Sequence, residues 1–263
     1  TNVPITIVQA VVTSLDSFTL LAIPFFMCAG ALMTETKISE KIFDLANSMV
    51  RHLPGGLAQV NIVASIITAG MSGTVVNDIA GIGPLEIRAM EKEGYPRPFA
   101  AAVTAASSSV GPIIPPSVPL VLIGSIMGTS ISALLIGGIV PGLLMGAVLM
   151  ALVFFISKKR HYPKLARVSL RELVRSFWKA IPALLMPVIL IGGFMSGFVT
   201  PTEAACLAVV YAIFLGFVVY RNMSFKRFWR ALENAAILAS ITMMIIACSG
   251  AFGLVITQQQ IPQ

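Results

Sequence analysis

Charged residues are scarce in this sequence: 11% of its 263 residues are Asp, Glu, Lys or Arg, whereas 57% are hydrophobic. A soluble domain carries about 25% charged residues, so the composition excludes an ordinary soluble protein. It predicts an all-α polytopic membrane protein, with the lipid bilayer as a partner. The segment from Pro98 to Ser157 contains no charged residue. No aromatic-and-basic surface pattern occurs, so no nucleic-acid partner is expected.

Residues suited to enzymatic or metal chemistry are also few. The two histidines, His52 and His161, lie in predicted surface loops, and the sequence has no paired carboxylates and no G-x-S-x-G elbow. Cys28, Cys206 and Cys248 lie in separate apolar segments, without the spacing of a metal site or a disulfide framework. We therefore predict three buried, unreactive cysteines and a protein that is not an enzyme.

The distribution of positive charge predicts the topology. Twelve of the 18 basic residues lie in two short segments, 158–179 and 221–230, and such segments favour the cytoplasmic side. About six spanning helices and one hairpin are expected. The predicted elements are a helix at 15–33, an amphipathic helix at 35–54, a hairpin at 57–85, a charged loop at 86–98, a broken helix at 99–127, a helix at 131–157 kinked near Pro141–Gly142, a basic linker at 158–180 with an amphipathic helix at 168–180, and helices at 181–199, 204–220 and 232–257.

The hairpin prediction depends on length and charge. Two apolar arms, each too short to span a bilayer, flank a tip rich in Gly, Ser and Thr within residues 70–84. Because the charged segments on both sides favour the cytoplasm, we predict a re-entrant hairpin that enters and leaves from inside. One tilted helix broken at Gly70–Gly73 is the alternative. Asp78 follows the tip, and it is predicted either to bind an ion or to hold the turn through a local Asx bond.

Prolines interrupt the uncharged segment 99–127. Each proline lacks a backbone donor and disfavours helix in the preceding residue, so residues 107–117 cannot form a regular helix. Broken helices of this kind line ion and ligand sites in secondary transporters. Freed carbonyls and nearby hydroxyls would supply oxygen ligands for Na⁺; the alternative, close packing of small residues, leaves the prolines unexplained. The prolines are Pro112, Pro115, Pro116 and Pro119, and the hydroxyls are Ser107, Ser108, Ser109 and Ser117.

The segment Thr200-Pro-Thr-Glu203 matches a capping box. Thr200 would accept from the third residue of the helix, and Glu203 would reach back to the N-cap amide. We therefore predict a helix start here, with contact between Glu203 and substrate as the alternative.

Several stretches resemble the large membrane subunit of tripartite ATP-independent periplasmic (TRAP) transporters: HLPGGLAQVNIVASIITAGMSGT, GYPRPFAAAVTAASSSVGPIIPPSVP and GFVTPTEAACLAVVYA. The resemblance implies an elevator-type transporter of inverted repeats in the bacterial or archaeal inner membrane. Such a transporter imports organic acids, such as dicarboxylates or sialic acid, by symport with Na⁺. A small membrane subunit and a periplasmic substrate-binding protein are the implied partners. Residues 1–157 would form the first repeat, 158–180 a linker, and 181–263 an incomplete second repeat of a longer protein.

The same resemblance implies the site residues. The implied Na⁺ ligands are Met71, Ser72, Gly73, Thr74, Gly111, Pro112, Ile114 and Pro115, and the implied substrate contacts are Ser72, Thr74, Asn77, Ser107, Ser108, Ser109, Pro116 and Ser117. The amphipathic helices at 35–54 and 168–180 are expected to link a moving unit to a static scaffold. A Na⁺/dicarboxylate symporter of another elevator family, a passive channel and a non-transporting scaffold subunit are the alternatives.

Overall fold

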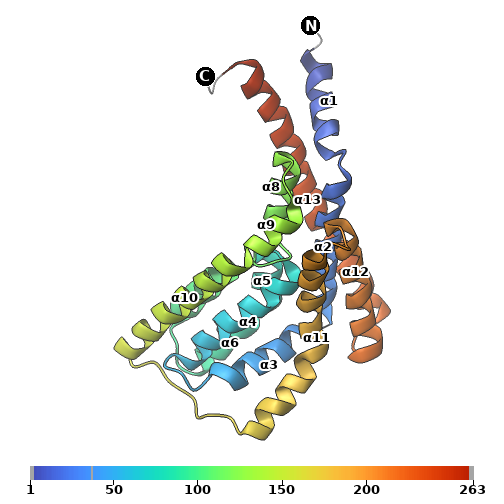
Figure 1. Cartoon of the computed structure of the whole chain (residues 1–263). Helices are drawn as coiled ribbons and strands as arrows, with labels where there is room; N and C mark the ends of the chain where they lie inside the picture. Colours follow the sequence, from blue (N-terminus) through green and yellow to red (C-terminus); the bar gives the residue numbers. More distant parts are fainter. Residues whose placement is uncertain (1–2, 37, 261–263) are drawn as a thin grey trace.

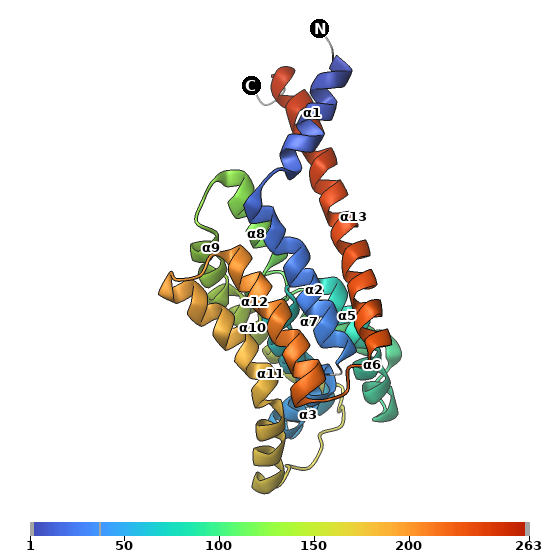
Figure 2. The same cartoon turned by 90° about the vertical axis from the view of Figure 1, so that its right-hand side faces the viewer.

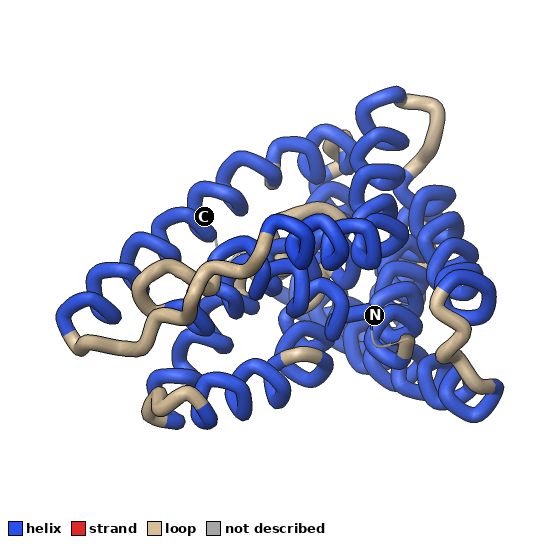
Figure 3. Tube along the Cα trace, turned by 90° about the horizontal axis from the view of Figure 1, so that it is seen from below, coloured by secondary structure: helices blue, strands red, loops and turns tan. Residues whose placement is uncertain are grey.

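The computed structural model describes residues 3–36 and 38–260, without the side chains of residues 3, 4, 72 and 77. All regular structure in these ranges is helical, as Figures 1 and 3 show. The elements are α1 (Val3–Leu15), η1 (Phe18–Leu21), α2 (Ala22–Glu35), α3 (Ile38–Val50), α4 (Gly56–Ser72), α5 (Val75–Gly81), α6 (Gly83–Lys92), α7 (Arg97–Ser108), α8 (Val118–Met127), α9 (Ile131–Gly137), α10 (Ile139–Lys159), α11 (Leu170–Ser196), α12 (Pro201–Phe214), η2 (Leu215–Val219) and α13 (Phe225–Gln258).

Among the described residues, five helical segments are long and apolar enough to cross a membrane: Phe18–Glu35, Ile131–Lys159, Leu170–Ser196, Pro201–Val219 and Phe225–Gln258. The prediction of an all-helical polytopic membrane protein is therefore confirmed. The sixth predicted span, 99–127, is divided into α7 and α8, and neither helix alone is long enough to span a bilayer.

Rows of small residues hold one side of the molecule together. Helix α2 packs along α12 and α13 (Figure 2), and its own Ala29, Gly30 and Ala31 are buried. Small side chains let helix backbones approach closely, which is the usual way that helices associate in membranes. The facing alanines recur every fourth residue, at Ala204, Ala208 and Ala212 of α12 and at Ala231, Ala235 and Ala239 of α13.

Helix α4 lies at the centre of the other side, between α3, α7 and α10 (Figure 1). The chain reverses at Gly73–Thr74 and returns as α5 and α6. Across this reversal, Thr68 Oγ1 of α4 donates to Asp78 Oδ1 of α5 over 2.6 Å. The alternative of one tilted helix is therefore wrong, because this bond requires the two arms to lie side by side. That the hairpin re-enters the bilayer stays a prediction.

Several predicted boundaries need correction. The chain has an additional helix, α1, and the span predicted from residue 15 begins at Phe18, after a break at Asp16–Ser17. The segment 86–98, predicted to be a charged loop, is helical as far as Lys92. Its buried residues Gly83, Glu86 and Met90 recur every three or four positions, which is the spacing of one face of a helix.

Two breaks in the second half also differ from the prediction. The kink expected near Pro141–Gly142 occurs at Gly138, between α9 and α10. Pro141 lies in the first turn of α10, where a missing N–H costs nothing. The amphipathic helix predicted at 168–180 and the span predicted at 181–199 form the single helix α11, with Pro182 inside it. Helix α13 begins at Phe225, within the segment predicted to be a loop, and Ser224 Oγ caps it by accepting from Arg227 N.

Candidate functional site

The hairpin tip is formed by two residues between α4 and α5. Helix α4 ends in Gly73, which has φ 62° and whose N–H donates to Ala69 O over 3.2 Å. Only glycine adopts this left-handed conformation without steric cost. The tip is therefore a helix C-cap followed directly by the start of α5 at Val75.

The proline-containing break lies between α7 and α8. Helix α7 ends at Ser108 and α8 begins at Val118, so residues 109–117 are not helical, as the prolines predict. The predicted break at 107–117 begins two residues too early, because Ser107 and Ser108 form the last turn of α7. Ser117 caps α8: its Oγ accepts from Leu120 N over 3.2 Å and donates to the Pro112 carbonyl. The peptide bond between Pro115 and Pro116 is cis.

The tip and the break lie against each other, main chain to main chain. A Cβ atom on Gly73 would lie 2.0 Å from Pro116 O, and one on Gly111 would lie 3.6 Å from Thr74 O. Val118 N lies 3.5 Å from Gly73 O. The structure thus brings together five of the predicted site residues: Gly73, Thr74, Gly111, Pro116 and Ser117.

Other predicted site residues lie elsewhere or have other partners. The Met71 side chain lines a cavity of about 20 Å³ beside Asp78, large enough for one water molecule. Ile114 packs with Ala69 and Val110 in an apolar cluster. Pro115 is buried in the break, and the side chains of Ser72 and Asn77 lie outside the described part of the structure.

The three adjacent serines, Ser107, Ser108 and Ser109, differ in burial and in hydrogen-bond partners. Ser107 and Ser108 are buried and face α4 and α5, whereas Ser109 is exposed and donates to Ala106 O. Ser107 Oγ donates to Asn61 Oδ1 over 2.7 Å, and Ser65 Oγ donates to Ser107 Oγ over 3.0 Å. Two of the three hydroxyls therefore connect α7 to the hairpin from within the protein.

Asp78 is the centre of these connections. Its Oδ1 accepts from Thr68 Oγ1 and its Oδ2 accepts from Ser108 Oγ, each over 2.6 Å, and the residue is 4% exposed. The alternative of a local Asx bond is wrong, because these partners lie 10 and 30 residues away in the sequence. Asp78 ties both arms of the hairpin to the helix that leads into the break.

Helix α4 carries inward-facing polar residues that the predicted site does not include. Asn61, Ser65 and Thr68 all face inward, and Asn61 Nδ2 donates to Thr104 Oγ1 of α7 over 2.7 Å. Their spacing of four and three residues within an apolar helix puts them on one face. The spacing of these three polar residues is the sequence pattern that indicates a buried polar face on α4.

Glu86 was also missed, because it lies in a run of charged residues. The residue is 1% exposed, and neither carboxyl oxygen has a hydrogen-bond partner among the described residues. Burial, and secondarily the nearby Asp78 carboxylate, raise the pKa of the Glu86 carboxyl well above its ordinary value. Helix α6 is not one of the five spanning segments.

The predicted capping box is confirmed. Glu203 N donates to Thr200 Oγ1 over 3.3 Å, and Thr200 N donates to Glu203 Oε2 over 2.8 Å. Both groups of the box are thereby satisfied at the start of α12. The prediction of three buried cysteines needs correction: Cys28 and Cys206 are half-buried, but Cys248 is exposed.

No cluster of three or more His, Cys, Asp or Glu side chains suited to a metal ion occurs in the described ranges. An ion between the tip and the break would instead be held by carbonyl and hydroxyl oxygens. These are the neutral donors that suit Na⁺.

The whole chain, residues 1–263, matches the family model described as the tripartite ATP-independent periplasmic transporter, DctM component. The chain belongs to this family. Among curated relatives, it is 44% identical over 255 residues to the sialic acid TRAP transporter large permease protein SiaM of Vibrio cholerae, with 97% of this chain and 60% of that protein covered.

Two further TRAP relatives are similarly close. The 2,3-diketo-L-gulonate large permease protein YiaN of Escherichia coli is 41% identical over 254 residues, covering 97% of this chain and 60% of that protein. The C4-dicarboxylate large permease protein DctM of Pseudomonas aeruginosa is 40% identical over 248 residues, covering 94% and 58%. The chain thus spans about 60% of the length of the TRAP permeases that it matches.

Proposed function

We propose that this chain is part of the large permease subunit of a TRAP transporter that imports an organic acid together with Na⁺ across the inner membrane of a bacterium or archaeon. In this proposal a periplasmic binding protein delivers the substrate, a small membrane subunit accompanies the permease, and inverted repeats move as an elevator. Family membership and the five apolar helices support a membrane permease and argue against an enzyme or another elevator family. Relatives named for sialic acid and C4-dicarboxylate support the substrate class.

The contact between the tip and the break carries the proposal. Main-chain atoms of Thr74 and Pro116 pack directly against Gly111 and Gly73, and a Cβ on Gly73 would collide with Pro116 O. A hard cation requires several oxygen ligands, and carbonyls provide them without a buried formal charge. Na⁺ bound there would add positive charge between the hairpin and the break. We therefore assign the ion to this contact.

The substrate site would lie on the same segment. No Lys or Arg lies within residues 98–157 to pair with a carboxylate. The N-terminus of α8, which follows Ser117, carries partial positive charge from its amides. We propose that this helix end and the exposed hydroxyl of Ser109 meet the substrate carboxylate. Ser107 and Ser108 do not contact the substrate in this proposal. They hold the break against the hairpin.

Uptake by the full-length permease in complex with its small subunit tests the proposal. In proteoliposomes, we expect organic-acid uptake that requires both a Na⁺ gradient and the binding protein. Uptake that ignores the gradient, or that proceeds at the same rate without the binding protein, contradicts the proposal.

A pair of adjacent serines tests the residue assignments. Ser108→Ala removes one of the two hydrogen bonds to the buried Asp78 carboxylate, a loss of about 1.5–3 kcal/mol. The apparent affinity for Na⁺ should fall roughly 10- to 100-fold. Ser109→Ala leaves the bonds to Asp78 intact and removes a hydroxyl that we assign to the substrate. It should therefore weaken substrate binding and keep the wild-type affinity for Na⁺ measured without substrate. Equal Na⁺ affinities in the two variants contradict the assignment of Ser108.

A further inference from the structure

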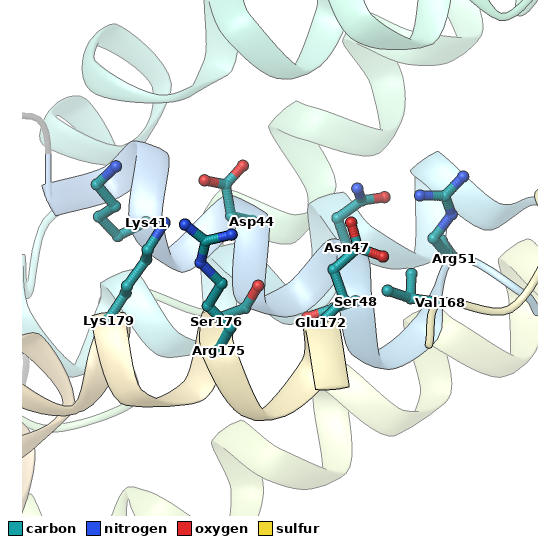
Figure 4. A pocket seen from close by; sticks show the side chains of 10 residues that line it. All are labelled: Lys41, Asp44, Asn47, Ser48, Arg51, Val168, Glu172, Arg175, Ser176 and Lys179. Atoms are coloured by element: carbon teal, nitrogen blue, oxygen red, sulfur yellow. The ribbon is translucent and has the colours of Figure 1, made fainter. Parts of the chain in front are cut away.

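A polar pocket of about 300 Å³ lies between α3 and the first half of α11, away from the hairpin and the break (Figure 4). Side chains from both helices point into the space between them. The basic members are Lys41 and Arg51 on the α3 side and Arg175 and Lys179 on the α11 side. We refer to it as the α3–α11 pocket.

Positive charge predominates in the α3–α11 pocket. Its four basic side chains face two acidic ones, Asp44 and Glu172. Within the described ranges, the ion pair that the structure contains joins Arg97 to Glu91, so none of the four pocket cations is paired with a carboxylate. Arg51 Nε also has no hydrogen-bond partner. Burial raises the pKa of Asp44, and the nearby positive charges of Lys41 and Lys179 act against this rise. Asp44 therefore neutralises part of the charge, and the four cations of the pocket still outnumber its two carboxylates.

The residues around the α3–α11 pocket indicate that it lies at the level of the membrane surface. On its outer side α11 exposes large apolar residues, including Leu170, Phe177 and Trp178, which are 76%, 49% and 69% exposed. Aromatic and basic residues at one end of a spanning helix indicate the level of the lipid headgroups. The eight basic residues within 158–179 put this interface on the cytoplasmic side. The pocket thus opens where the headgroups of the inner leaflet lie.

We propose that the α3–α11 pocket binds the phosphate headgroup of an anionic phospholipid from the cytoplasmic leaflet. Phosphate oxygens accept strong, charge-assisted hydrogen bonds from Arg and Lys, and basic pockets between helices on this side of a membrane suit such headgroups. Free inorganic phosphate has the same chemistry. The exposed apolar residues of α11 favour the lipid, because they lie where its acyl chains would pack.

A bound headgroup would strengthen the contact between two helices that are distant in the sequence but pack against each other. Residues 160–169 link α10 to α11 across the lower end of the molecule in Figure 1, and Leu165 N donates to Arg51 O over 3.2 Å. Arg51 and Arg175 on the same phosphate would hold α3 and α11 at one fixed separation. The lipid would therefore act as a structural part of the permease.

Native mass spectrometry of the full-length permease complex, titrated with phosphatidylglycerol after delipidation, tests this proposal. Arg175→Gln combined with Lys179→Gln removes two cations of the pocket. Since each basic residue near an anionic surface contributes about 1 kcal/mol, the affinity for the tightest-bound lipid should fall roughly 30-fold. Arg167→Gln combined with Arg171→Gln makes the same charge change beside the pocket and should keep the wild-type affinity. An equal loss in both double variants overturns the proposal, because it indicates general surface charge.

Two further arms separate the alternatives. Ser176→Asp adds a negative charge to the pocket without removing a cation, so it should also weaken phosphatidylglycerol binding; wild-type affinity in this variant overturns the site. Excess inorganic phosphate should displace little phosphatidylglycerol, and phosphatidylcholine should not replace it. Full displacement by inorganic phosphate means that the pocket takes the free ion, and equal binding of phosphatidylcholine means that the charge is irrelevant. Either result overturns the lipid assignment while leaving the transport proposal untouched.

Discussion

Substituting Gly73 by alanine should separate the hairpin tip from the break. The added Cβ would lie 2.0 Å from Pro116 O and 2.8 Å from Pro116 C, and both are main-chain atoms that no rotamer change can move. Real Cβ contacts do not fall below 3.0 Å, so the two segments would have to move apart by at least about 1 Å.

Two costs add at this position. Alanine in the left-handed conformation that Gly73 adopts costs about 1–2 kcal/mol. Overpacking against a rigid neighbour costs about 1–3 kcal/mol more. The sum, roughly 2–5 kcal/mol, would reduce the population of the closed tip by at least about 30-fold.

Gly94 provides the matched control. It has φ 88°, and a Cβ there would meet no atom within 4 Å, so Gly94→Ala carries the conformational cost without the collision. Both variants would be compared by Na⁺-driven uptake in proteoliposomes, at equal amounts of inserted full-length complex. We expect uptake by Gly73→Ala to fall more than tenfold below that of Gly94→Ala. Equal uptake by the two variants would refute the claim that transport depends on this main-chain contact.

Two other predictions concern stability. Because burial raises the pKa of Glu86 above its unfolded-state value, the protonated form favours folding, and stability should fall as the pH rises from the ordinary pKa of a glutamate towards the folded-state pKa. Glu86→Gln should remove this slope in thermal unfolding of the complex measured across pH, and a slope that persists would mean that Glu86 is not its source. Thr200→Ala removes the cap of α12 and should lower stability by about 1 kcal/mol, with Na⁺-driven uptake per folded complex unchanged. Lost uptake at unchanged stability would instead support the alternative that this segment contacts substrate.

The main features of the candidate site could be predicted because they depend on backbone chemistry. Proline has no N–H, so the break between Ser108 and Val118 follows from the sequence itself. The capping box at Thr200 is equally local. Gly73 at a turn-rich tip indicated the reversal of the hairpin.

The features that could not be predicted depend on burial. The run of charged residues at 86–98 predicts a loop, yet Glu86 lies inside a helix and faces the core. Similarly, the change from basic to apolar composition near residue 180 does not interrupt α11, because helix continuity depends on backbone hydrogen bonds. The break at Gly138 lies where Pro141 removes the hydrogen bond to the carbonyl of residue 137. The close approach of Ile113 O to Gly138, where a Cβ would lie 2.2 Å away, is a tertiary contact that no local pattern encodes.

The main-chain character of the contact between the tip and the break has an evolutionary consequence. Carbonyl oxygens stay the same when the side chain they belong to is replaced, so most substitutions around Gly73 and Gly111 leave the oxygens in place. The relatives named for sialic acid, 2,3-diketo-L-gulonate and C4-dicarboxylate are named for different substrates, although each is 40–44% identical to this chain. We expect members of this family to change substrate through substitutions of exposed side chains, while the glycines at the positions of Gly73 and Gly111 stay invariant. Substitution of these glycines is then limited by the lack of room for a side chain between the tip and the break, and not by the loss of a reactive group.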